Sequence, residues 1–481
     1  MAHNKFLPRV LAAAAAMMLL AGCGSKADPG FSPANPVNIT IWTYYNGEQL
    51  EAFNALVDEF NSTVGKEQGI TVESSSHGSV TDLENNVLAS AEGKVGAEAM
   101  PNIFSAYADT AYALDEMGQI ADLSDYLSEE DRAAFIEDYL SEGDFSGSGS
   151  IKIFPVAKSA ELLFLNETDW EPFAAATGAT YDDLATIEGL VSVAERYYEW
   201  TDAQTPDIPN DGRAFFGRDA MANYMLIGAK QLGCTIFDAQ DSSMTLNFDH
   251  DTVRTLWDNY YVPFIKGYFS ASGRFRSDDV KTGNIIAYVG SSSSATFFPT
   301  QVIADDMDSH DITRKALESP KFANGEDYAV QQGAGMVVTK ASDAEIQASL
   351  VFLKWFTSPE HNITFSVDSG YLPVTHEGNS IDAIRANGLA LSDEMDEVLS
   401  AAVDTVNANH LYTPRAFSGG TNARAILEYS MSDKASADRA AVKEAMAQGQ
   451  NFEEASAQFL SDECFEAWYQ DTLASLEAFQ G

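Results

Sequence analysis

The fold class is decided by residues 37–73, which read VNITIWTYYNGEQLEAFNALVDEFNSTVGKEQGITVE. Residues 37–42 alternate between β-branched or aromatic side chains and polar ones, a pattern typical of a strand. Apolar residues then recur at helical spacing between Glu48 and Phe60, and a second short strand is expected at residues 69–73. The order strand, helix, strand predicts two parallel strands joined by a right-handed crossover.

The same alternation continues along the chain and predicts the α/β class. Strands are expected at residues 102–107, 151–156, 162–166 and 285–289, and a helix at residues 83–91. A capping-box pattern at Ser342–Glu345 indicates the start of another helix. Runs rich in Gly, Ser, Asp and Pro are predicted to be surface loops, and they cover residues 143–150, expected to be a hairpin loop, and residues 202–212.

The N-terminus has the features of an export signal. Lys5 and Arg9 form a short basic region ahead of an apolar run at residues 10–21. A membrane-spanning helix needs about 20 apolar residues, so this run is too short to remain in the membrane. Residues 1–22 are therefore predicted to be a signal peptide that is cleaved.

The tetrad LAGC at residues 20–23 resembles the bacterial lipobox, in which the Cys thiol is alkylated by a diacylglyceryl group and becomes the new N-terminus. This resemblance implies that Cys23 carries fatty acyl chains such as palmitate, which anchor the protein in the membrane. Residues 23–36, the lipidated Cys and the polar stretch after it, would then form a flexible tether. The alternative is an ordinary signal peptide with an incidental Cys.

Length and charge restrict the function classes that are open to the rest of the chain. Residues 37–481 are too many for one hydrophobic core, which predicts two lobes of roughly 150 to 250 residues each. The formal net charge of −44 argues against nucleic-acid binding, which depends on clustered Lys and Arg, and indicates a well-solvated exterior. Only Cys234 and Cys464 follow Cys23, and the sequence leaves open whether they are bridged or free.

Short motifs are spread over most of the chain. They are ITIW (39–42), EFN (59–61), MPNI (100–103), FPVAKS (154–159), LFLN (163–166), GAGMVV (333–338), FLKWFTSPE (352–360) and SGYLPV (369–374). In number, order and spacing they resemble the extracellular solute-binding proteins of carbohydrate-type ABC importers, the family that contains maltose- and glycerol-3-phosphate-binding proteins.

The resemblance implies a periplasmic-binding-protein-like fold, with two α/β lobes joined by crossing hinge segments and a ligand cleft between the lobes. It would place residues 37–155 and 290–330 in the N-terminal lobe, and residues 156–289 and 333–481 in the C-terminal lobe. Loops at the carboxyl ends of parallel strands converge at such a crevice, so ligand contacts are expected there.

A polyhydroxylated ligand needs hydrogen-bonding groups around its hydroxyls and flat apolar surfaces against its CH faces. Tyr44 and Tyr45 follow the first strand, and each either stacks on the ligand or packs inside its own lobe. Ser76 and His77 follow the second strand, where a solvated turn is the alternative.

Four further candidates are favoured by the resemblance. Tyr107 and Asp109 lie in the loop after the next predicted strand, where the resemblance implies a ligand contact. Lys158 and Ser159 lie where the family often places short polar residues at an interlobe crossing. Lys158 either contacts the ligand or forms an ion pair with Glu161.

The remaining candidates lie nearer the C-terminus. Ser291 and Ser292 begin a run of four serines that is either a ligand contact or a low-complexity turn, and Gly333 would permit close approach of a ligand to the backbone. Tyr371 lies in a motif that supplies a ligand contact in the glycerophosphate-binding branch, and it could equally be structural. Arg415 loosely resembles the basic, Gly-containing loop of that branch; its guanidinium could hold a phosphate or form a surface or interlobe salt bridge.

These observations predict the substrate-binding subunit of an ABC importer, lipid-anchored on the outer face of the cell membrane. It would capture a carbohydrate or related polyol by hinge closure and deliver it to a membrane permease. A phosphorylated polyol such as glycerol-3-phosphate is the alternative ligand if Arg415 lies in the cleft. A sensor or adhesin lipoprotein is the alternative of another class.

Catalysis is not expected. The seven histidines lack metal-ligand spacing, and the chain has neither a Walker loop nor a nucleophile elbow. We therefore expect a monomer without cofactor or metal, and a glycoside hydrolase is the least favoured alternative.

Overall fold

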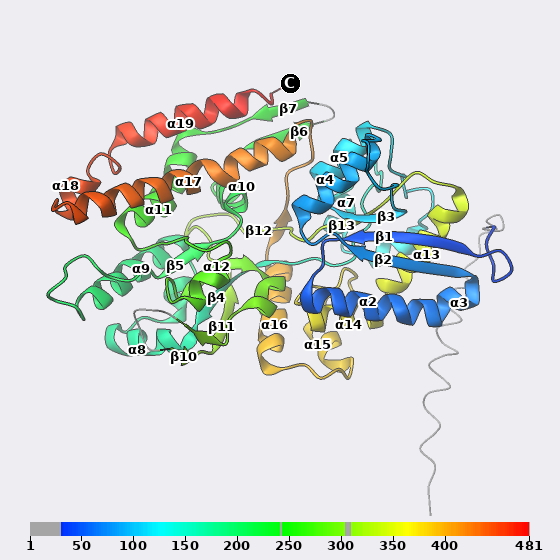
Figure 1. The fold of residues 1–481 in the computed structure, drawn as a ribbon, viewed down its shortest axis with the longest axis horizontal. Coiled ribbons are helices and arrows are strands. Elements are labelled where there is room, and N and C mark those ends of the chain that lie inside the picture. Colours follow the sequence, from blue (N-terminus) through cyan, green and yellow to red (C-terminus); the bar gives the residue numbers. More distant parts are fainter. Residues whose placement is uncertain (1–29, 241–242, 304–308, 481) are drawn as a thin grey trace, which may run out of the picture.

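The computed structural model describes residues 30–240, 243–303 and 309–480 of the chain. They form two lobes that lie side by side, each built around a four-stranded sheet with helices on its faces (Figure 1). The predicted α/β class and two-lobe fold are therefore confirmed.

The first sheet has the strand order β13-β3-β1-β2. Its strands are β1 (Val37–Thr43), β2 (Ile70–Ser76), β3 (Ile103–Ala106) and β13 (Gly335–Val338). β1 runs parallel to β2 and β3, whereas β13 is antiparallel to β3. The carboxyl ends of β1, β2 and β3 consequently lie at one edge of the sheet.

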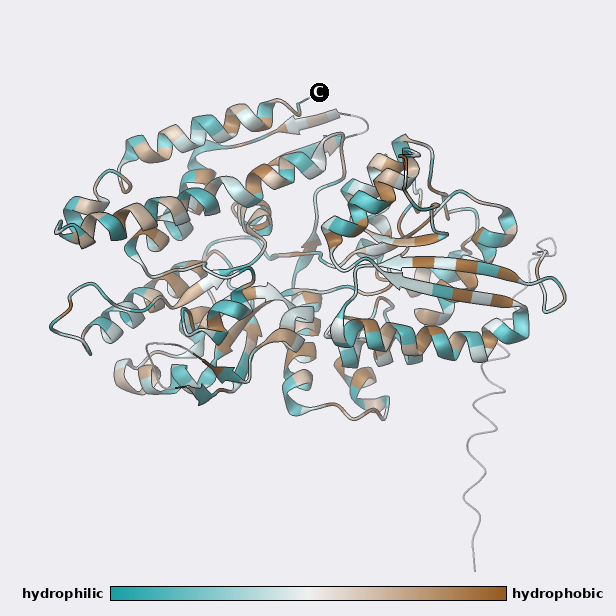
Figure 2. Ribbon diagram, in the orientation of Figure 1, coloured by the Kyte–Doolittle hydropathy of each residue, from teal (hydrophilic) through white to brown (hydrophobic). Residues whose placement is uncertain are grey.

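Helix α2 (Gly47–Ser62) forms most of the crossover between β1 and β2. Its buried face consists of Phe53, Leu56, Val57 and Phe60, which are at most 4% exposed, so the helical periodicity of the sequence reports a real packed face. Figure 2 shows hydrophobic and hydrophilic residues alternating along β1 and β2, because successive side chains of a strand point to opposite faces of the sheet.

The second sheet has the strand order β11-β4-β8-β5. Its strands are β4 (Glu161–Asn166), β5 (Phe216–Arg218), β8 (Ala287–Ser291) and β11 (Arg314–Glu318). β4 is antiparallel to both β8 and β11, whereas β5 is parallel to β8. The amino end of β4 and the carboxyl ends of the other three strands therefore share one edge.

Helices cover both lobes. In the second lobe they are α8 (Glu167–Thr177), α9 (Ile187–Asp202), α10 (Met221–Gln231), α11 (His250–Lys266), α12 (Arg276–Lys281), α17 (Gly420–Ala447), α18 (Phe452–Ser456) and α19 (Asp462–Glu477). In the first lobe they are α3 (Val64–Gln68), α4 (Val80–Ala91), α5 (Ala108–Glu116), α6 (Glu129–Ala134), α7 (Glu137–Ser141), α13 (Asp343–Phe356) and α14 (Pro359–Ser369). Helix α13 begins with the predicted capping box between Ser342 and Glu345.

The remaining elements are short or lie between the lobes. Helices α15 (Ile381–Ala386) and α16 (Asp393–Ala408) lie in the middle of Figure 1, and the 3-10 helices are η1 (Tyr181–Leu184) and η2 (Ser292–Phe297). Three two-stranded sheets pair β6 (Phe237–Gln240) with β7 (Ser243–Leu246), β9 (Gln301–Val302) with β10 (His310–Asp311), and β12 (Tyr328–Val330) with β14 (His410–Tyr412).

Three segments run side by side where the two lobes meet, and we call them the junction segments: residues 154–160, 331–336 and 370–374. Isolated β-bridges join the first junction segment to the other two, at Phe154 with Met336, Ser159 with Gln332 and Lys158 with Leu372. The chain crosses between the lobes at this point, so changes in the relative position of the lobes must act on these segments.

The strand predicted at residues 151–156 is wrong. Ile151, Ile153, Phe154 and Val156 are all at most 3% exposed, but the segment forms only the bridge at Phe154. Its alternation comes from burial at the lobe junction, and Pro155 has no N–H with which to continue a ladder. Residues 143–150 are consequently a loop that leads from α7 into the first junction segment, not a hairpin.

The sheets also differ from the predicted lobe boundaries. β11 lies within residues 290–330, predicted for the N-terminal lobe, yet it pairs with β4 in the second sheet. β13 lies within residues 333–481, predicted for the C-terminal lobe, yet it pairs with β3 in the first sheet. The chain therefore returns to the first lobe after β12, because β13 completes the first sheet as an antiparallel edge strand.

The signal peptide predicted at residues 1–22 and the lipidation site at Cys23 lie outside the described residues. The end of the predicted tether is packed rather than free: Phe31 is 9% exposed within the first lobe, and Ser32 and Asn35 hydrogen-bond each other through their backbones. Within the described residues, none of the helices has the length and apolar character needed to cross a membrane.

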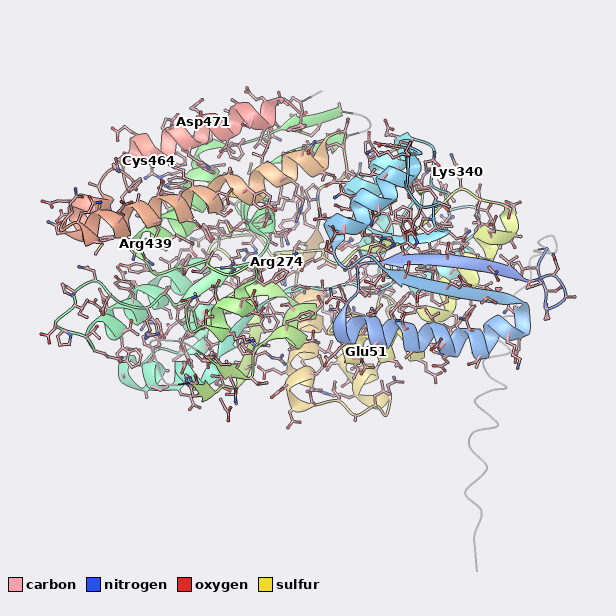
Figure 3. The ribbon with its side chains drawn as sticks, in the orientation of Figure 1. Glu51, Arg274, Lys340, Arg439, Cys464 and Asp471 are labelled. Atoms are coloured by element: carbon pink, nitrogen blue, oxygen red, sulfur yellow. The ribbon has the colours of Figure 1, made fainter. Side chains whose placement is uncertain are left out.

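We expect Phe53→Ala to lower the free energy of unfolding by about 3 to 5 kcal/mol, because it removes a buried ring that contacts Tyr45, Phe352 and Phe365. Urea unfolding of the purified protein measures this change. The control is Glu51→Ala, an exposed residue on the same helix (Figure 3), which should change stability by less than about 0.5 kcal/mol. Equal effects of the two substitutions would contradict the packing described above.

Candidate functional site

Four tyrosines meet at the carboxyl edge of the first sheet. We call Tyr44, Tyr45, Tyr107 and Tyr371 the tyrosine cluster. The hydroxyl oxygens of Tyr44 and Tyr371 lie 3.3 Å apart, and Tyr107 interacts electrostatically with Tyr371. Two cluster members follow β1, one follows β3, and one comes from a junction segment, so the cluster lies where the first lobe meets the junction.

Two of these tyrosines belong to the hydrophobic core. Tyr45 is 2% exposed and packs against Phe53 and Phe365, and Tyr371 is 5% exposed and stacks on Phe365. Tyr44 and Tyr107 are only partly buried. Of the predicted tyrosine contacts, Tyr44 and Tyr107 are therefore the ones with surface to offer a solute.

Burial is the main reason why the pKa of each of the four hydroxyls lies above its ordinary value, because a buried phenolate is poorly solvated. The neighbouring phenols and, at Tyr107, the carboxylates of Glu142 and Glu84 act in the same direction. The cluster consequently presents neutral O–H groups, each of which can donate and accept a hydrogen bond.

The residues at the end of β2, Ser76 and His77, have partners in their own lobe. Ser76 is exposed and donates a hydrogen bond to the carbonyl of Tyr45 over 2.6 Å. The ring of His77 lies 4.3 Å from that of Trp42, and its Nδ1 lies 2.9 Å from Nδ2 of Asn86. Both residues support the loops at this edge of the sheet.

Lys158 is fully buried and forms an ion pair with Glu142. Its ammonium group also donates to the carbonyl of Gly333 over 2.8 Å, and this links two junction segments. Of the two alternatives that the sequence left open for Lys158, the ion pair with Glu161 is wrong, because Glu161 instead forms a buried ion pair with Arg218.

Gly333 has a φ of 92°, and a Cβ there would lie 2.9 Å from the carbonyl of Ala157. The glycine thus allows two junction segments to approach each other, whereas the sequence predicted an approach to a ligand. Lys158 and Gly333 together fix the junction.

The predicted serines divide between the junction and the second sheet. Ser159 is 3% exposed, and its hydroxyl has no hydrogen-bond partner among the described residues. Ser292 donates to the carbonyl of Gly370 over 2.9 Å and so orients the turn that carries Tyr371. The hydroxyl oxygens of Ser291 and Ser293 lie 2.9 Å apart.

Asp109 lies at the start of α5 and faces the second lobe. A Cβ at Gly420, the first residue of α17, would lie 2.5 Å from Oδ1 of Asp109, so the glycine permits this approach between the lobes. Burial raises the pKa of the Asp109 carboxyl to about 6. The positive charge of Arg424 acts against that shift, and the carboxylates of Glu84 and Glu142 add to it.

Sequence reasoning singled out Arg415 but missed Arg424. Arg415 is exposed, and its guanidinium lies against Gly147. Arg424 donates a hydrogen bond to the side chain of Asn223 and interacts electrostatically with Asp109. Part of the signal was available in the sequence, because Gly420 and Arg424 are four residues apart and share one face of a helix that begins at the second glycine of a Gly-Gly pair.

Three further polar residues lie in the second lobe near the start of β4, and the sequence did not predict any of them as a site residue. Glu161, Arg218 and Asn223 are each at most 7% exposed. Glu161 accepts hydrogen bonds from both Arg218 and Asn223, the latter over 2.7 Å. They come from the start of β4, the end of β5 and helix α10, elements that only the folded sheet brings together.

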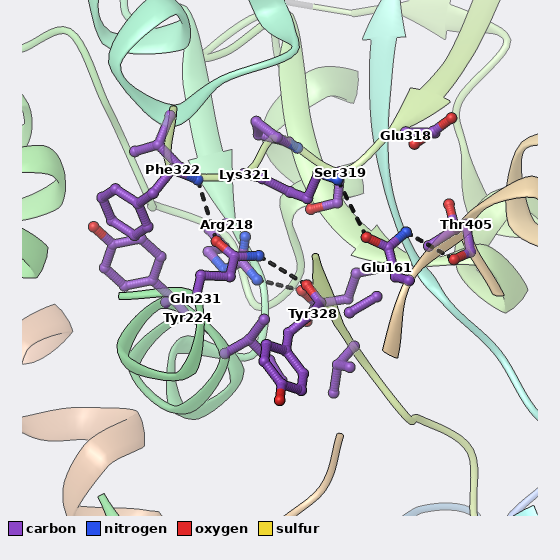
Figure 4. Close-up of a pocket in the computed structure, with 17 residues that line it drawn as sticks. Glu161, Arg218, Tyr224, Gln231, Glu318, Ser319, Lys321, Phe322, Tyr328 and Thr405 are labelled. Carbon is purple, nitrogen blue, oxygen red and sulfur yellow. Dashed lines mark hydrogen bonds and ion pairs between the residues drawn. The ribbon is translucent and has the colours of Figure 1, made fainter. Parts of the chain in front are cut away.

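A small cavity of about 40 Å³ lies beside Glu161 and Arg218. Figure 4 shows Gln231 in its wall, between Phe322 and Tyr328, and it hydrogen-bonds the backbone of both. The Nε atom of Arg218 is buried without a partner in the described part of the chain. The space suffices for one or a few water molecules, so this cavity is a site for buried water and not a solute pocket.

A family model described as a bacterial extracellular solute-binding protein matches residues 55–390. The chain is a bacterial extracellular solute-binding protein. The resemblance recognised in the sequence motifs is therefore confirmed, and the family assigns the protein to the outside of the cytoplasmic membrane.

Solved structures of other solute-binding proteins share the fold. The cyclic alpha-maltosyl-1,6-maltose binding protein of Arthrobacter globiformis is 17% identical, with a TM-score of 0.65 over 92% of this chain and 100% of that one. UgpB of Mycobacterium tuberculosis, in complex with glycerophosphocholine, has the same identity and TM-score over 92% and 99% of the chains. An ABC substrate-binding protein of Listeria monocytogenes, in complex with cycloalternan, is 15% identical with a TM-score of 0.62 over 88% and 99%. A comparison with curated protein sequences gave no significant match.

Other features of the solute-binding protein concern its chemistry. Cys234 and Cys464 are both free, which answers the question that the sequence left open. Within residues 30–240, 243–303 and 309–480, His, Cys, Asp and Glu form no group of three or more that could hold a metal ion.

Asp109 should make the stability of the solute-binding protein depend on pH. Its pKa is raised from 3.8 to about 6 in the folded state, so the folded protein holds this proton more tightly than the unfolded chain does. The stabilisation is complete below about pH 4 and is lost as the pH rises through about 6. We expect the free energy of unfolding of the wild type, relative to Asp109→Asn, to fall by about 1 to 2 kcal/mol over that range, allowing for partial exposure.

Urea unfolding of both proteins at intervals between pH 4 and pH 7 measures this difference. Asp219 also has a pKa raised to about 6 by burial, but it is present in both proteins, so its contribution cancels. A difference that stays constant would show that the Asp109 carboxyl is as well solvated in the folded protein as in the unfolded chain, and a difference that rises with pH would show that the charge of Arg424 outweighs burial.

Proposed function

We propose that this solute-binding protein is the binding subunit of an ABC importer and that its solute is a neutral carbohydrate or related polyol. Closure of the two lobes would capture the solute, and the closed form would deliver it to a membrane permease. The observation that carries this proposal is the close approach of Asp109 of the first lobe to Gly420 of the second lobe, where Asp109 and Tyr107 both interact electrostatically with Arg424.

The chemistry of the tyrosine cluster, Asp109 and Arg424 suits vicinal hydroxyl groups. The tyrosines offer flat rings and neutral O–H groups, a carboxylate accepts hydrogen bonds, and a guanidinium donates them. Arg424 interacts electrostatically with Asp109 and donates one hydrogen bond to Asn223, and a guanidinium has five N–H groups, so it has further donors for a hydroxyl placed between it and Asp109. A solute held by both residues would link the lobes.

Charge balance favours a neutral solute. Lys158 is paired with Glu142 and Arg218 with Glu161, so these cations are already compensated. A phosphate group would bring further negative charge close to Asp109, which repels it. Arg415, the predicted phosphate ligand, is exposed.

The relatives support both solute classes to different degrees. The proteins from Arthrobacter globiformis and Listeria monocytogenes are described with oligosaccharides, whereas the one from Mycobacterium tuberculosis is described with glycerophosphocholine. A phosphorylated polyol therefore remains the second candidate, and the structures that share the fold at low identity do not decide between the two.

The membrane attachment belongs to the same proposal. We propose that residues 1–22 are removed, that Cys23 carries the lipid anchor, and that the protein works as a monomer on the outer face of the membrane. Mass spectrometry of the protein purified from membranes would detect the acyl chains on an N-terminal Cys23. A mature N-terminus elsewhere, without lipid, would contradict this anchor.

A thermal-shift screen of residues 24–481 tests the solute. We expect linear and cyclic glucose oligosaccharides to raise the melting temperature, because a ligand that binds only the folded state stabilises it by about 2.7 kcal/mol at 100 times its Kd. Glycerol-3-phosphate and glycerophosphocholine form the second arm. A shift with these alone would favour the phosphorylated class, and no shift in either arm would count against the proposed solute.

Tyr107→Ala should weaken binding of the best solute at least 10-fold, measured by calorimetry, because it removes a ring and a hydroxyl from the site. Tyr112→Ala is the matched control, since Tyr112 lies on α5 and is also partly buried but packs against Phe145. Equal affinity of the two variants would remove Tyr107 from the site.

A further inference from the structure

We propose that Glu161 and Asn223 are positioning residues that hold Arg424 toward the solute and couple it to the lobe junction. This proposal rests on the proposed function, because it assigns to Arg424 a role in solute binding. It concerns residues on three different elements, β4, α10 and α17, and each has a defined hydrogen bond to the next.

The contacts form a continuous series. Oε1 of Glu161 accepts a hydrogen bond from Nδ2 of Asn223 over 2.7 Å, and Oδ1 of Asn223 accepts one from Nη2 of Arg424. Oε2 of Glu161 accepts from Arg218. Glu161 and Asn223 are 5% and 1% exposed, so water cannot easily replace either bond.

The charges of Glu161 and Arg424 fix the orientation of the Asn223 amide. A carboxylate only accepts hydrogen bonds and a guanidinium only donates them, so the amide of Asn223 must point its nitrogen at Glu161 and its oxygen at Arg424. An amide can serve both neighbours, because its nitrogen donates and its oxygen accepts. Asn223 thereby transmits the position of Glu161 to Arg424 in a single orientation.

Helix α17 is fastened at a second point one turn further along. The carboxylate of Glu428 accepts hydrogen bonds from the backbone N–H groups of Met221 and Ala222, over 3.1 and 2.7 Å, at the start of α10. These N–H groups have no partner within their own helix, and a negative charge is favourable there. Arg424 and Glu428 therefore dock the same face of α17 onto the first turn of α10, directly after the turn at Ala220 that joins α10 to β5.

That turn is held in a costly backbone conformation. Ala220 has a φ of 51° and a ψ of 64°, the left-handed region that a residue with a side chain rarely adopts. Such strain persists only where surrounding contacts hold it in place, and the contacts here are those of Glu428 and Asn223. The strained turn brings Asn223 to the position between Glu161 and Arg424.

The other end of the series reaches the junction. Glu161 is the first residue of β4 and directly follows the junction segment that contains Lys158 and Ser159. Ala160 accepts a hydrogen bond from the backbone of Ser292 over 2.8 Å, so the junction segment is also tied to the second sheet. A shift of this segment would move Glu161, and through Asn223 it would move Arg424.

The main test is Asn223→Leu, which removes both hydrogen bonds, keeps the branching at Cγ and leaves the pair of Glu161 and Arg218 in place. We expect the affinity for the best solute to fall about 10-fold. In 15N NMR spectra of the wild type we expect signals of an Arg424 guanidinium group whose rotation is restricted. In Asn223→Leu we expect the signals of a freely rotating group. Asn247→Leu, an exposed site in the same lobe, is the matched control and should change neither.

The NMR readout needs no solute, so the two proposals fail separately. Unchanged Arg424 signals in Asn223→Leu would overturn the positioning role. Changed signals with unchanged affinity would support the positioning role and count against Arg424 as a solute contact.

Asn223→Asp covers the case in which the leucine variant does not fold. It keeps an acceptor for Arg424 but places a second carboxylate beside Glu161. We expect restricted Arg424 signals and reduced stability in this variant. Freely rotating Arg424 signals would overturn the proposal.

Discussion

A fully buried ammonium group lies where the chain passes between the two lobes. An isolated charge in that place would be very unfavourable, so Lys158 must keep its bonds to Glu142 and to the carbonyl of Gly333. These partners come from the first lobe and from a second junction segment. The arrangement fixes the point at which the lobes join, and the sites on either side of it depend on that point.

On both sides of the junction, charged groups occur in compensated sets, in which each positive charge lies near a negative one. Glu142 balances Lys158, Glu161 balances Arg218, and Asp109 lies close to Arg424 across the two lobes. The interior of the site is thus close to neutral within a protein whose formal net charge is −44. This contrast assigns the acidic surplus to groups outside these three compensated sets.

Local sequence patterns predicted much of the fold, and each wrong prediction has a physical reason. The spacing of apolar residues in α2 and their alternation in β1 indicate that one face of each element is buried. Such a pattern can be recognised from residues that are close together in the sequence. Residues 151–156 show the same alternation but form no strand, because they are buried at the junction instead of paired in a sheet. For the two tyrosines after β1 the sequence left ligand contact and core packing open, and the core position of Tyr45 depends on Phe53 and Phe365, which are far apart in the sequence.

By itself the sequence determined the α/β class, the presence of two lobes and the family, because these follow from periodicity, length and short motifs. Only the tertiary structure decided that Lys158 meets Glu142 and not Glu161, and that Arg424 and not Arg415 faces Asp109. Pairing between distant polar side chains depends on how strands are ordered in each sheet and on how the lobes meet. Neither leaves a local pattern that identifies the partner, since the spacing of Gly420 and Arg424 marks one face of a helix but not the residue that meets this face from the other lobe.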